Sequence, residues 1–250
     1  MDFGPLSIVS GYPALYHRVD KTAIIADLHL GFESEAQREG VYLPRLQLRK
    51  ALELIRGLSE AVEPKKLVID GDVKQCFSRL SSQEREELSR IFAEAKDRFE
   101  RVELVRGNHD NYVNLIASRF DIPLVDELGL SGGVLVLHGH VEPKREPRAG
   151  ELLVIGHEHP ALRIPDELGG VVKIRSFLFV PLRTGAVAVV LPAAGYYQVG
   201  NVVTLIREHY LSPIIRKYGV LEEAVPVVVE PGEAPLEFPP LRSLFELVGP

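Results

Sequence analysis

The stretch VELVRGNHD, residues 102–110, decides the fold, because it joins a strand-like segment to a polar motif. Its first four residues are mostly apolar, as in a buried strand, and a polar, helix-like pattern begins at Asn111. The motif Gly107-Asn108-His109-Asp110 therefore lies where a strand ends, which in open α/β sheets is where ligands bind. Asn108 and His109 offer an amide oxygen and an imidazole, although the motif taken alone is equally consistent with a plain turn.

Four other strand-like segments end in the same kind of polar motif. They are residues 22–26, 66–70, 133–137 and 152–155, and they lead into Asp27-Leu28-His29, Gly71-Asp72, His138-Gly139-His140 and Gly156-His157-Glu158-His159. Asp27 and His29 are two residues apart, so continued strand geometry would point both side chains to one face, within reach of one metal ion. Six of the eight histidines lie in these five motifs, which argues against ordinary core histidines.

Composition limits the classes of protein that the chain can belong to. The chain has 250 residues, 46% of them hydrophobic, which suits one large domain or a domain with an appendage. A net charge of −6 argues against a surface that binds nucleic acid by charge everywhere, but it allows a local basic groove. A single cysteine excludes an internal disulfide and a cysteine-rich zinc site.

The expected location is cytoplasmic, with no membrane partner. The first residues lack the basic start and apolar stretch of a signal peptide, and the longest apolar run, residues 185–194, is too short to span a bilayer. Tryptophan is absent and methionine occurs once, while glutamate and arginine are plentiful, which favours a thermophilic source.

The order of predicted elements indicates an α/β fold. In the first half, strands alternate with helices at residues 44–62 and from the capping motif at Ser81 to about Glu100, a pattern that implies parallel pairing. In the second half, residues 171–174, 177–180 and 186–191 read as short strands of an antiparallel meander. Residues 201–218 carry a helical pattern broken at Pro213. Two facing mixed sheets with helices outside, an α/β/β/α sandwich, would reconcile the two halves.

The motifs together supply two carboxylates, one amide oxygen and four imidazoles: Asp27, His29, Asp72, Asn108, His138, His157 and His159. Seven ligands are too many for one ion and suit two ions that share a bridging carboxylate. Mixed oxygen and nitrogen ligands favour Mn²⁺, with Zn²⁺, Fe, Co²⁺ or Mg²⁺ as alternatives. Paired metals are a known device for displacement at phosphorus.

These five motifs, which occur in order over residues 27–159, resemble those of the calcineurin-like metallophosphoesterase superfamily. Within it, residues 26–31 and 156–160 are similar to archaeal phosphoesterases related to double-strand-break repair nucleases and to ligase-associated phosphodiesterases. The resemblance implies the metallophosphoesterase sandwich. We expect residues 1–195 to form the catalytic domain, and residues 196–250 to form an extension that packs on this domain or extends it. The resemblance implies one metal on Asp27, His29, Asp72 and His159, and a second on Asp72, Asn108, His138 and His157.

The resemblance also implies that His109 contacts phosphate or protonates the leaving oxygen. Many members of the superfamily carry an aspartate three residues after the bridging aspartate to orient this histidine, whereas this chain has Gln75, which can accept a hydrogen bond but adds no charge. His140 is a phosphate contact or simply a loop residue. Several basic residues either line a substrate groove or form a solvated surface: Lys74, Arg79, Lys144, Arg145 and Arg148.

Three functions remain open from the sequence. The first hypothesis is a metal-dependent phosphodiesterase, including a nuclease that acts on DNA or RNA. The second is a phosphatase or phosphodiesterase for a small molecule such as a nucleotide. The third is a scaffold without catalysis, which has no physical need for seven convergent ligands. An open basic groove near residues 144–148 favours a polymer, and a closed pocket favours a small ligand. The sequence does not indicate an oligomeric state.

Overall fold

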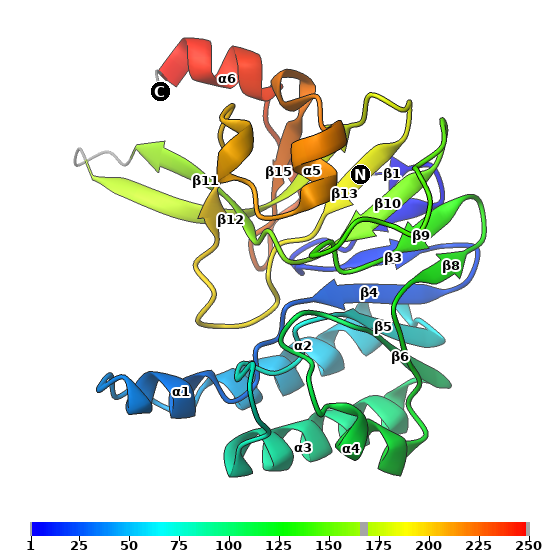
Figure 1. Ribbon diagram of the computed structural model, residues 1–250, viewed down its shortest axis with the longest axis vertical. Coiled ribbons are helices and arrows are strands. Elements are labelled where there is room, and N and C mark those ends of the chain that lie inside the picture. The colour runs from blue at the N-terminus through cyan, green and yellow to red at the C-terminus, as the bar shows by residue number, and fades with distance from the viewer. Residues whose placement is uncertain (1, 166–169, 249–250) are drawn as a thin grey trace.

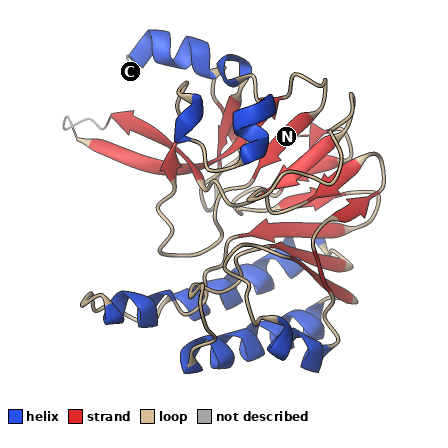
Figure 2. Ribbon diagram, in the orientation of Figure 1, coloured by secondary structure: helices blue, strands red, loops and turns tan. Residues whose placement is uncertain are grey.

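Two β-sheets lie face to face at the centre of the computed structural model, which describes residues 2–165 and 170–248 (Figure 1). Helices form the outer layers, with those of the first half of the chain below the first sheet and those of its last part above the second (Figure 2). This arrangement is the α/β/β/α sandwich that the sequence predicted. None of the helices within the described residues is long and apolar enough to cross a membrane.

The first sheet has seven strands, paired in the order in which they occur along the chain. They are β1 (Asp2–Phe3), β2 (Leu6–Ile8), β3 (Leu15–His17), β4 (Thr22–Ala26), β5 (Lys66–Asp70), β6 (Arg101–Val105) and β7 (Leu124–Val125). The pairs from β1 to β4 are antiparallel, and those from β4 to β7 are parallel, as the strand–helix–strand pattern predicted. The carboxyl ends of β4, β5 and β6 therefore share one edge.

The helices of the first half lie on one side of this sheet, and all but the first contribute apolar side chains to the core against it. They are α1 (Phe32–Arg38), α2 (Gln47–Val62), α3 (Ser82–Arg98), α4 (Asn114–Ala117) and the 3-10 turn η1 (Ser118–Phe120). The predicted capping box opens α3, since the Ser81 hydroxyl accepts from Glu84 N and the Glu84 carboxylate accepts from Ser81 N. Pro44 and the two residues after it precede α2 as a turn, so this helix is shorter than predicted at its start.

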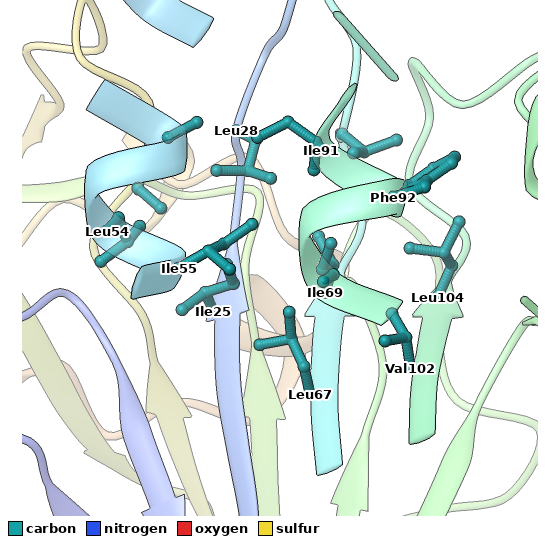
Figure 3. Packing of buried hydrophobic residues seen from close by; sticks show 14 of the residues in the cluster. Ile25, Leu28, Leu54, Ile55, Leu67, Ile69, Ile91, Phe92, Val102 and Leu104 are labelled. Atoms are coloured by element: carbon teal, nitrogen blue, oxygen red, sulfur yellow. The ribbon is translucent and has the colours of Figure 1, made fainter. Parts of the chain in front are cut away.

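Alternate residues of the central strands face two different cores. One set packs against α2 and α3, as Figure 3 shows; it includes Ile25, Leu67, Ile69 and Leu104. The residues between them pack against the second sheet; they include Ile24, Val68 and Val105. Burial on both faces explains why these strands read as continuous apolar runs in the sequence.

The second sheet has the order β14-β11-β12-β13-β10-β9-β8, with β15 beside β12 and β16 beside β15. Its strands are β8 (Leu128–Leu130), β9 (Val134–Val136), β10 (Leu152–Ile155), β11 (Pro160–Pro165), β12 (Val171–Pro181), β13 (Val187–Val190), β14 (Asn201–Val202), β15 (Val225–Val228) and β16 (Leu236–Glu237). Strands β14 to β16, which come from the last third of the chain, thus extend this sheet.

The predicted antiparallel meander is confirmed where β12 pairs with β11 and β13, but antiparallel pairing does not extend to the centre of the sheet. Strand β10 pairs in parallel with both β9 and β13. Parallel pairing requires each connection to return the chain to the starting end of the sheet. The long basic loop at residues 139–151 does this between β9 and β10, and the antiparallel pair β11–β12 lies between β10 and β13. The two strands predicted at 171–174 and 177–180 are one strand, β12, whose first half pairs with β11 and whose second half pairs with β13 and β15.

The helical pattern predicted for residues 201–218 is wrong over its first part. That part forms β14 and a 3-10 turn, η2 (Arg207–His209), and only α5 (Pro213–Tyr218) is helical. Pro213 begins this helix instead of breaking it, because the first turn needs no proline N–H and the Ser212 hydroxyl accepts from Ile214 N. Helix α5, the turn η3 (Leu221–Glu223) and helix α6 (Leu241–Val248) contribute to the core on the outer face of the second sheet.

Removing the largest apolar side chain of the first core should measure how strongly this layer stabilises the fold. Phe92 of α3 is fully buried, with its ring 6.0 Å from that of Phe120. Phe92→Ala should lower the free energy of unfolding by about 3–5 kcal/mol, because it removes buried area and leaves a cavity. Leu115→Ala, at a site that is 51% exposed, should change it by less than about 0.5 kcal/mol. Urea unfolding measures both, and equal effects would contradict the assignment of this core.

Candidate metal centre

Four strand ends, those of β4, β5, β9 and β10, bring six carboxylate and imidazole side chains into two adjacent groups. Ligand atoms in the first group, Asp27, His29 and His159, lie within 4.8 Å of one another, and so do those of Asp72, His138 and His157 in the second. Each group combines residues that follow the first sheet with residues that follow the second. The predicted convergence of these motifs therefore arises where the edges of the two sheets meet.

Asp72 lies between the two groups. Its Oδ1 accepts a hydrogen bond of 2.9 Å from the backbone N–H of His109, which fixes the carboxylate in place. Its Oδ2 is 3.3 Å from His138 Nε2 and 4.0 Å from His29 Nε2, so one oxygen faces imidazoles of both groups. This is the geometry that a bridging carboxylate requires.

Asp27 is fully buried and joins the two sheets by its side chain. Its Oδ2 accepts a 3.1 Å hydrogen bond from the backbone N–H of His157, and its Oδ1 is 3.1 Å from His159 Nε2. The Asp27 carboxylate thus orders the loop that carries both of these histidines.

The backbone at these ligands is left-handed and not extended. Asp27, His29, Asp72, His157 and His159 have φ between 46° and 67°, and they make up five of the nine non-glycine residues with positive φ in the described chain. Each such residue costs on the order of 1 kcal/mol or more, and it persists only where the surroundings dictate it. The expectation that Asp27 and His29 face one site because the strand continues is therefore wrong in its reason, since β4 ends at Ala26.

Glycines at the same strand ends allow the groups to approach closely. A Cβ on Gly107 would collide with Oδ1 and N of Asp72, and one on Gly71 would collide with the His138 ring. A Cβ on Gly156 would lie 2.8 Å from Asp27 Oδ2. Glycine is therefore required beside both candidate bridging and terminal carboxylates.

Charge compensation dominates the protonation of this site. Burial opposes ionisation of Asp72, but the nearby His138 outweighs it, and the pKa of Asp72 is lowered. Burial acts against a charged His138, yet Asp72 and Asp27 raise its pKa to about 10. For His29 and His157, burial outweighs the attraction of the nearby carboxylates and lowers the pKa of each to about 4. Protons on some of these imidazoles thus neutralise the carboxylates, a role that metal cations can take over.

Buried atoms without hydrogen-bond partners add to the evidence for cations. Among the described residues, Asn108 Oδ1 and His29 Nδ1 are buried and lack a hydrogen-bond partner. Such atoms are costly in a folded protein unless something binds them. Oxygen and imidazole donors with spare capacity fit divalent transition metals, so the donor set agrees with two ions.

His109 lies beside the first group without belonging to it. Its ring centroid is 5.3 Å from that of His29. Its Nδ1 lies 2.5 Å from the backbone oxygen of Gln75 and donates to it, which leaves Nε2 free. The residue that replaces the orienting aspartate thus acts through its main chain, while its side-chain oxygen is buried without a partner.

The three residues predicted to contact substrate lie in different surroundings. The His140 ring is 5.4 Å from His138 and 6.1 Å from His157, so the fold places it beside the second group. Lys74 is fully buried and donates to the Cys76 carbonyl, so it is not on a groove surface. Arg145 binds both oxygens of Glu151, at 2.8 and 2.5 Å, which occupies its guanidinium.

Two further carboxylates that hold the site were not singled out in the sequence. Asp110 is buried and accepts from the backbone N–H groups of Gly107 and Val73, so it ties two of the ligand loops together. Burial, with help from Asp72, raises the pKa of Asp110 to about 6. Glu158, between the paired histidines, accepts from the N–H groups of Leu211 and Ser212. Their positions inside the motifs were the available signal, but only the fold shows their partners.

Comparison with known proteins gives a consistent result. Residues 21–178 match the family model described as calcineurin-like phosphoesterase. The fold is similar to that of the Pseudomonas putida nuclease MPE, with a TM-score of 0.60 and 20% identity over 90% of this chain and 92% of that chain. A protein of unknown function from Aquifex aeolicus aligns with 55% of this chain and 78% of that chain, at 20% identity and a TM-score of 0.36. No curated protein sequence matches.

The close packing at Gly107 should be essential for metal binding. Gly107→Ala places a methyl group against Asp72 and should displace its carboxylate, so that binding of Mn²⁺ weakens while the fold persists. Gly129→Ala, where a Cβ meets nothing within 4 Å, is the matched control and should bind as the native protein does. Calorimetric titration with Mn²⁺ and far-UV circular dichroism test this, and native affinity in Gly107→Ala would contradict the placement of Asp72.

Proposed function

Because the chain belongs to the calcineurin-like phosphoesterase family, whose members hydrolyse phosphate esters, we propose that it is a dinuclear phosphodiesterase acting on nucleic acid. The observation that carries the proposal is Asp72, whose Oδ2 faces imidazoles of two ligand groups. A site of this kind suits displacement at phosphorus, which needs charge stabilisation on more than one oxygen.

In this proposal Asp27, His29, Asp72 and His159 hold one ion, and Asp72, Asn108, His138 and His157 hold the other. Mn²⁺ is the first choice because the donors mix oxygen and nitrogen. When bound, the two ions supply Lewis-acid stabilisation of the phosphoryl group and an activated water. The chain's contribution is to hold the ligands in one orientation through the hydrogen bonds to Asp72 and Asp27.

His109 is proposed to serve the leaving group. Its Nε2 is the free ring nitrogen, since Nδ1 donates to Gln75 O. The contact is to a neutral carbonyl, which orients the ring in the way that an aspartate would but adds no negative charge. With both ring nitrogens protonated, His109 can donate the Nε2 proton to the departing oxygen and is left as the neutral imidazole with its proton on Nδ1. His140, on the side of the second group, is proposed as a contact for substrate phosphate.

The last part of the chain belongs to the same proposal. We assign residues 1–195 to the catalytic domain and residues 196–250 to an extension that supports it. The support lies in Glu158, which binds two backbone N–H groups at residues 211–212, and in Asn201, whose amide donates to the Glu158 backbone oxygen at 3.0 Å. Both contacts hold the loop that carries His157 and His159.

Nucleic acid is the first substrate class to test, because the structurally similar Pseudomonas putida protein is a nuclease. The purified protein loaded with Mn²⁺ should hydrolyse labelled single-stranded DNA and bis-para-nitrophenyl phosphate faster than para-nitrophenyl phosphate, and chelation should abolish all three activities. Preference for the monoester with no cleavage of DNA would favour a small-molecule phosphatase instead. No activity with any substrate in the presence of Mn²⁺, Zn²⁺, Fe²⁺, Co²⁺ or Mg²⁺ would contradict the proposal.

Replacing His109 should separate acid catalysis from metal binding. His109→Ala should lower turnover on DNA by roughly 10²–10⁴-fold, toward the lower end, because Gln75 offers no charge. The loss should be smaller for nitrophenyl esters, whose leaving group needs no proton. The metal content of His109→Ala should equal that of the native protein. The control is His209→Ala, which removes an exposed histidine of η2 and should leave turnover and metal content unchanged. Loss of metal would make His109 a ligand, and equal losses for both leaving groups would make it a phosphate contact.

A further inference from the structure

Phe77 is a large apolar side chain that lies in solvent beside the proposed acid. It is 56% exposed, and its ring centroid is 6.0 Å from that of His109, edge to face at 88°. Single exposed apolar residues are common and need no explanation by themselves. Phe77 differs because its ring lies beside the His109 ring, which in turn lies beside the His29 ring of the first ligand group.

The backbone around Phe77 is held by buried polar groups on both sides. The preceding residue, Cys76, donates its N–H to Glu84 Oε1 at 2.6 Å and accepts from Lys74 at its carbonyl. The Phe77 carbonyl itself accepts from Asn111 Nδ2 at 3.1 Å. Lys74 and Glu84 are fully buried, so their hydrogen bonds to this loop are shielded from water and restrict its movement.

An exposed ring on a rigid loop is suited to binding a flat ligand. Little conformational freedom remains to be lost when such a ring makes a contact, so more of the interaction appears as affinity. Bases of nucleic acids stack on aromatic side chains with little dependence on sequence, and each stack contributes enough to change affinity by about five- to a hundredfold. A base adjoining a phosphate held at the ligand groups would lie on the His109 side of the site.

We propose that Phe77 stacks on an unpaired nucleobase next to the scissile phosphate, which makes single-stranded nucleic acid the preferred substrate. The proposal rests on the proposed function and names its substrate class. An unpaired base is required because both faces of a base in a duplex are covered by its neighbours.

Binding can be measured without catalysis, because the sequence contains no tryptophan. Phe77→Trp introduces a single indole whose fluorescence a stacked base should quench. The metal-free protein, titrated with a short oligothymidylate, should show saturable quenching. An abasic oligomer of the same length, which carries the same phosphates, should leave the fluorescence unchanged, and a blunt duplex should quench it little. The proposal would be overturned if the abasic oligomer or the duplex quenched the fluorescence as strongly as the oligothymidylate does. It would also be overturned if no oligomer quenched the fluorescence.

Kinetics supply the second test, with Mn²⁺-loaded protein. Phe77→Leu keeps an apolar side chain but removes the ring, so KM for oligothymidylate should rise about five- to a hundredfold with kcat nearly unchanged. Phe77→Tyr should restore the native KM, and cleavage of the abasic oligomer should be the same for all variants. Leu236→Ala, at an exposed position of β16 that is 59% accessible, is the control for loss of surface apolar area.

Failure of the stacking proposal and failure of the proposed function give different experimental results. If Phe77→Leu slows cleavage of base-bearing and abasic oligomers equally, Phe77 only positions His109 and the stacking proposal is wrong. If the native protein cleaves neither oligomer with any metal, the proposed function is wrong, whatever the fluorescence titration shows. Replacing thymidylate by uridylate in both assays distinguishes DNA from RNA as the source of the base.

Discussion

The geometry of the candidate metal centre depends on one buried carboxylate, Asp72, that lies between two groups of imidazoles. One of its oxygens is held by a backbone N–H of the Gly107–Asp110 motif, and the other faces His138 and His29. A buried carboxylate is tolerated only if opposite charge or hydrogen bonds compensate for its lost hydration. The surrounding imidazoles do so when protonated, and metal ions can do so in their place. The same compensation that allows Asp72 to be buried makes the site suitable for cations.

The site is formed at a cost to the backbone, and the packing of the two sheets offsets it. Left-handed conformations at five non-glycine residues are unfavourable in isolation. They occur at the ends of strands whose faces are both buried, where neighbouring strands determine the path of the chain. Asp110 adds to this by binding the N–H groups of Gly107 and Val73. Rigid strands and hydrogen-bonded turns thus hold the ligands near one another before any ion binds.

Groups outside the ligand set determine how the site is presented to a substrate. Lys74 and Glu84 are buried and hold the loop that carries Gln75 and Phe77. That loop in turn orients the His109 ring through the Gln75 carbonyl. On the opposite side, Glu158 connects the paired-histidine loop to the last part of the chain. These buried charged residues therefore act within the protein, by fixing the loops that lie beside the candidate metal centre.

The sequence by itself determined the central strands, the parallel pairing of the first half and the six acidic and histidine residues that the fold brings together in the candidate metal centre. Apolar runs that end in Asp, Asn or His are local patterns, and parallel strands bring such ends to one edge whatever the details of packing. The tertiary structure alone decided the parallel position of β10, the strand and turn before Pro213, and the roles of Lys74, Arg145 and Gln75. Strand pairing, the burial of Lys74 and the contact of Gln75 with His109 depend on which partners distant segments find. The Arg145–Glu151 pair spans only six residues, but it depends on the path that the loop between them takes. Left-handed φ at Asp27 and His29 is of the same kind, since only the surrounding fold can stabilise it.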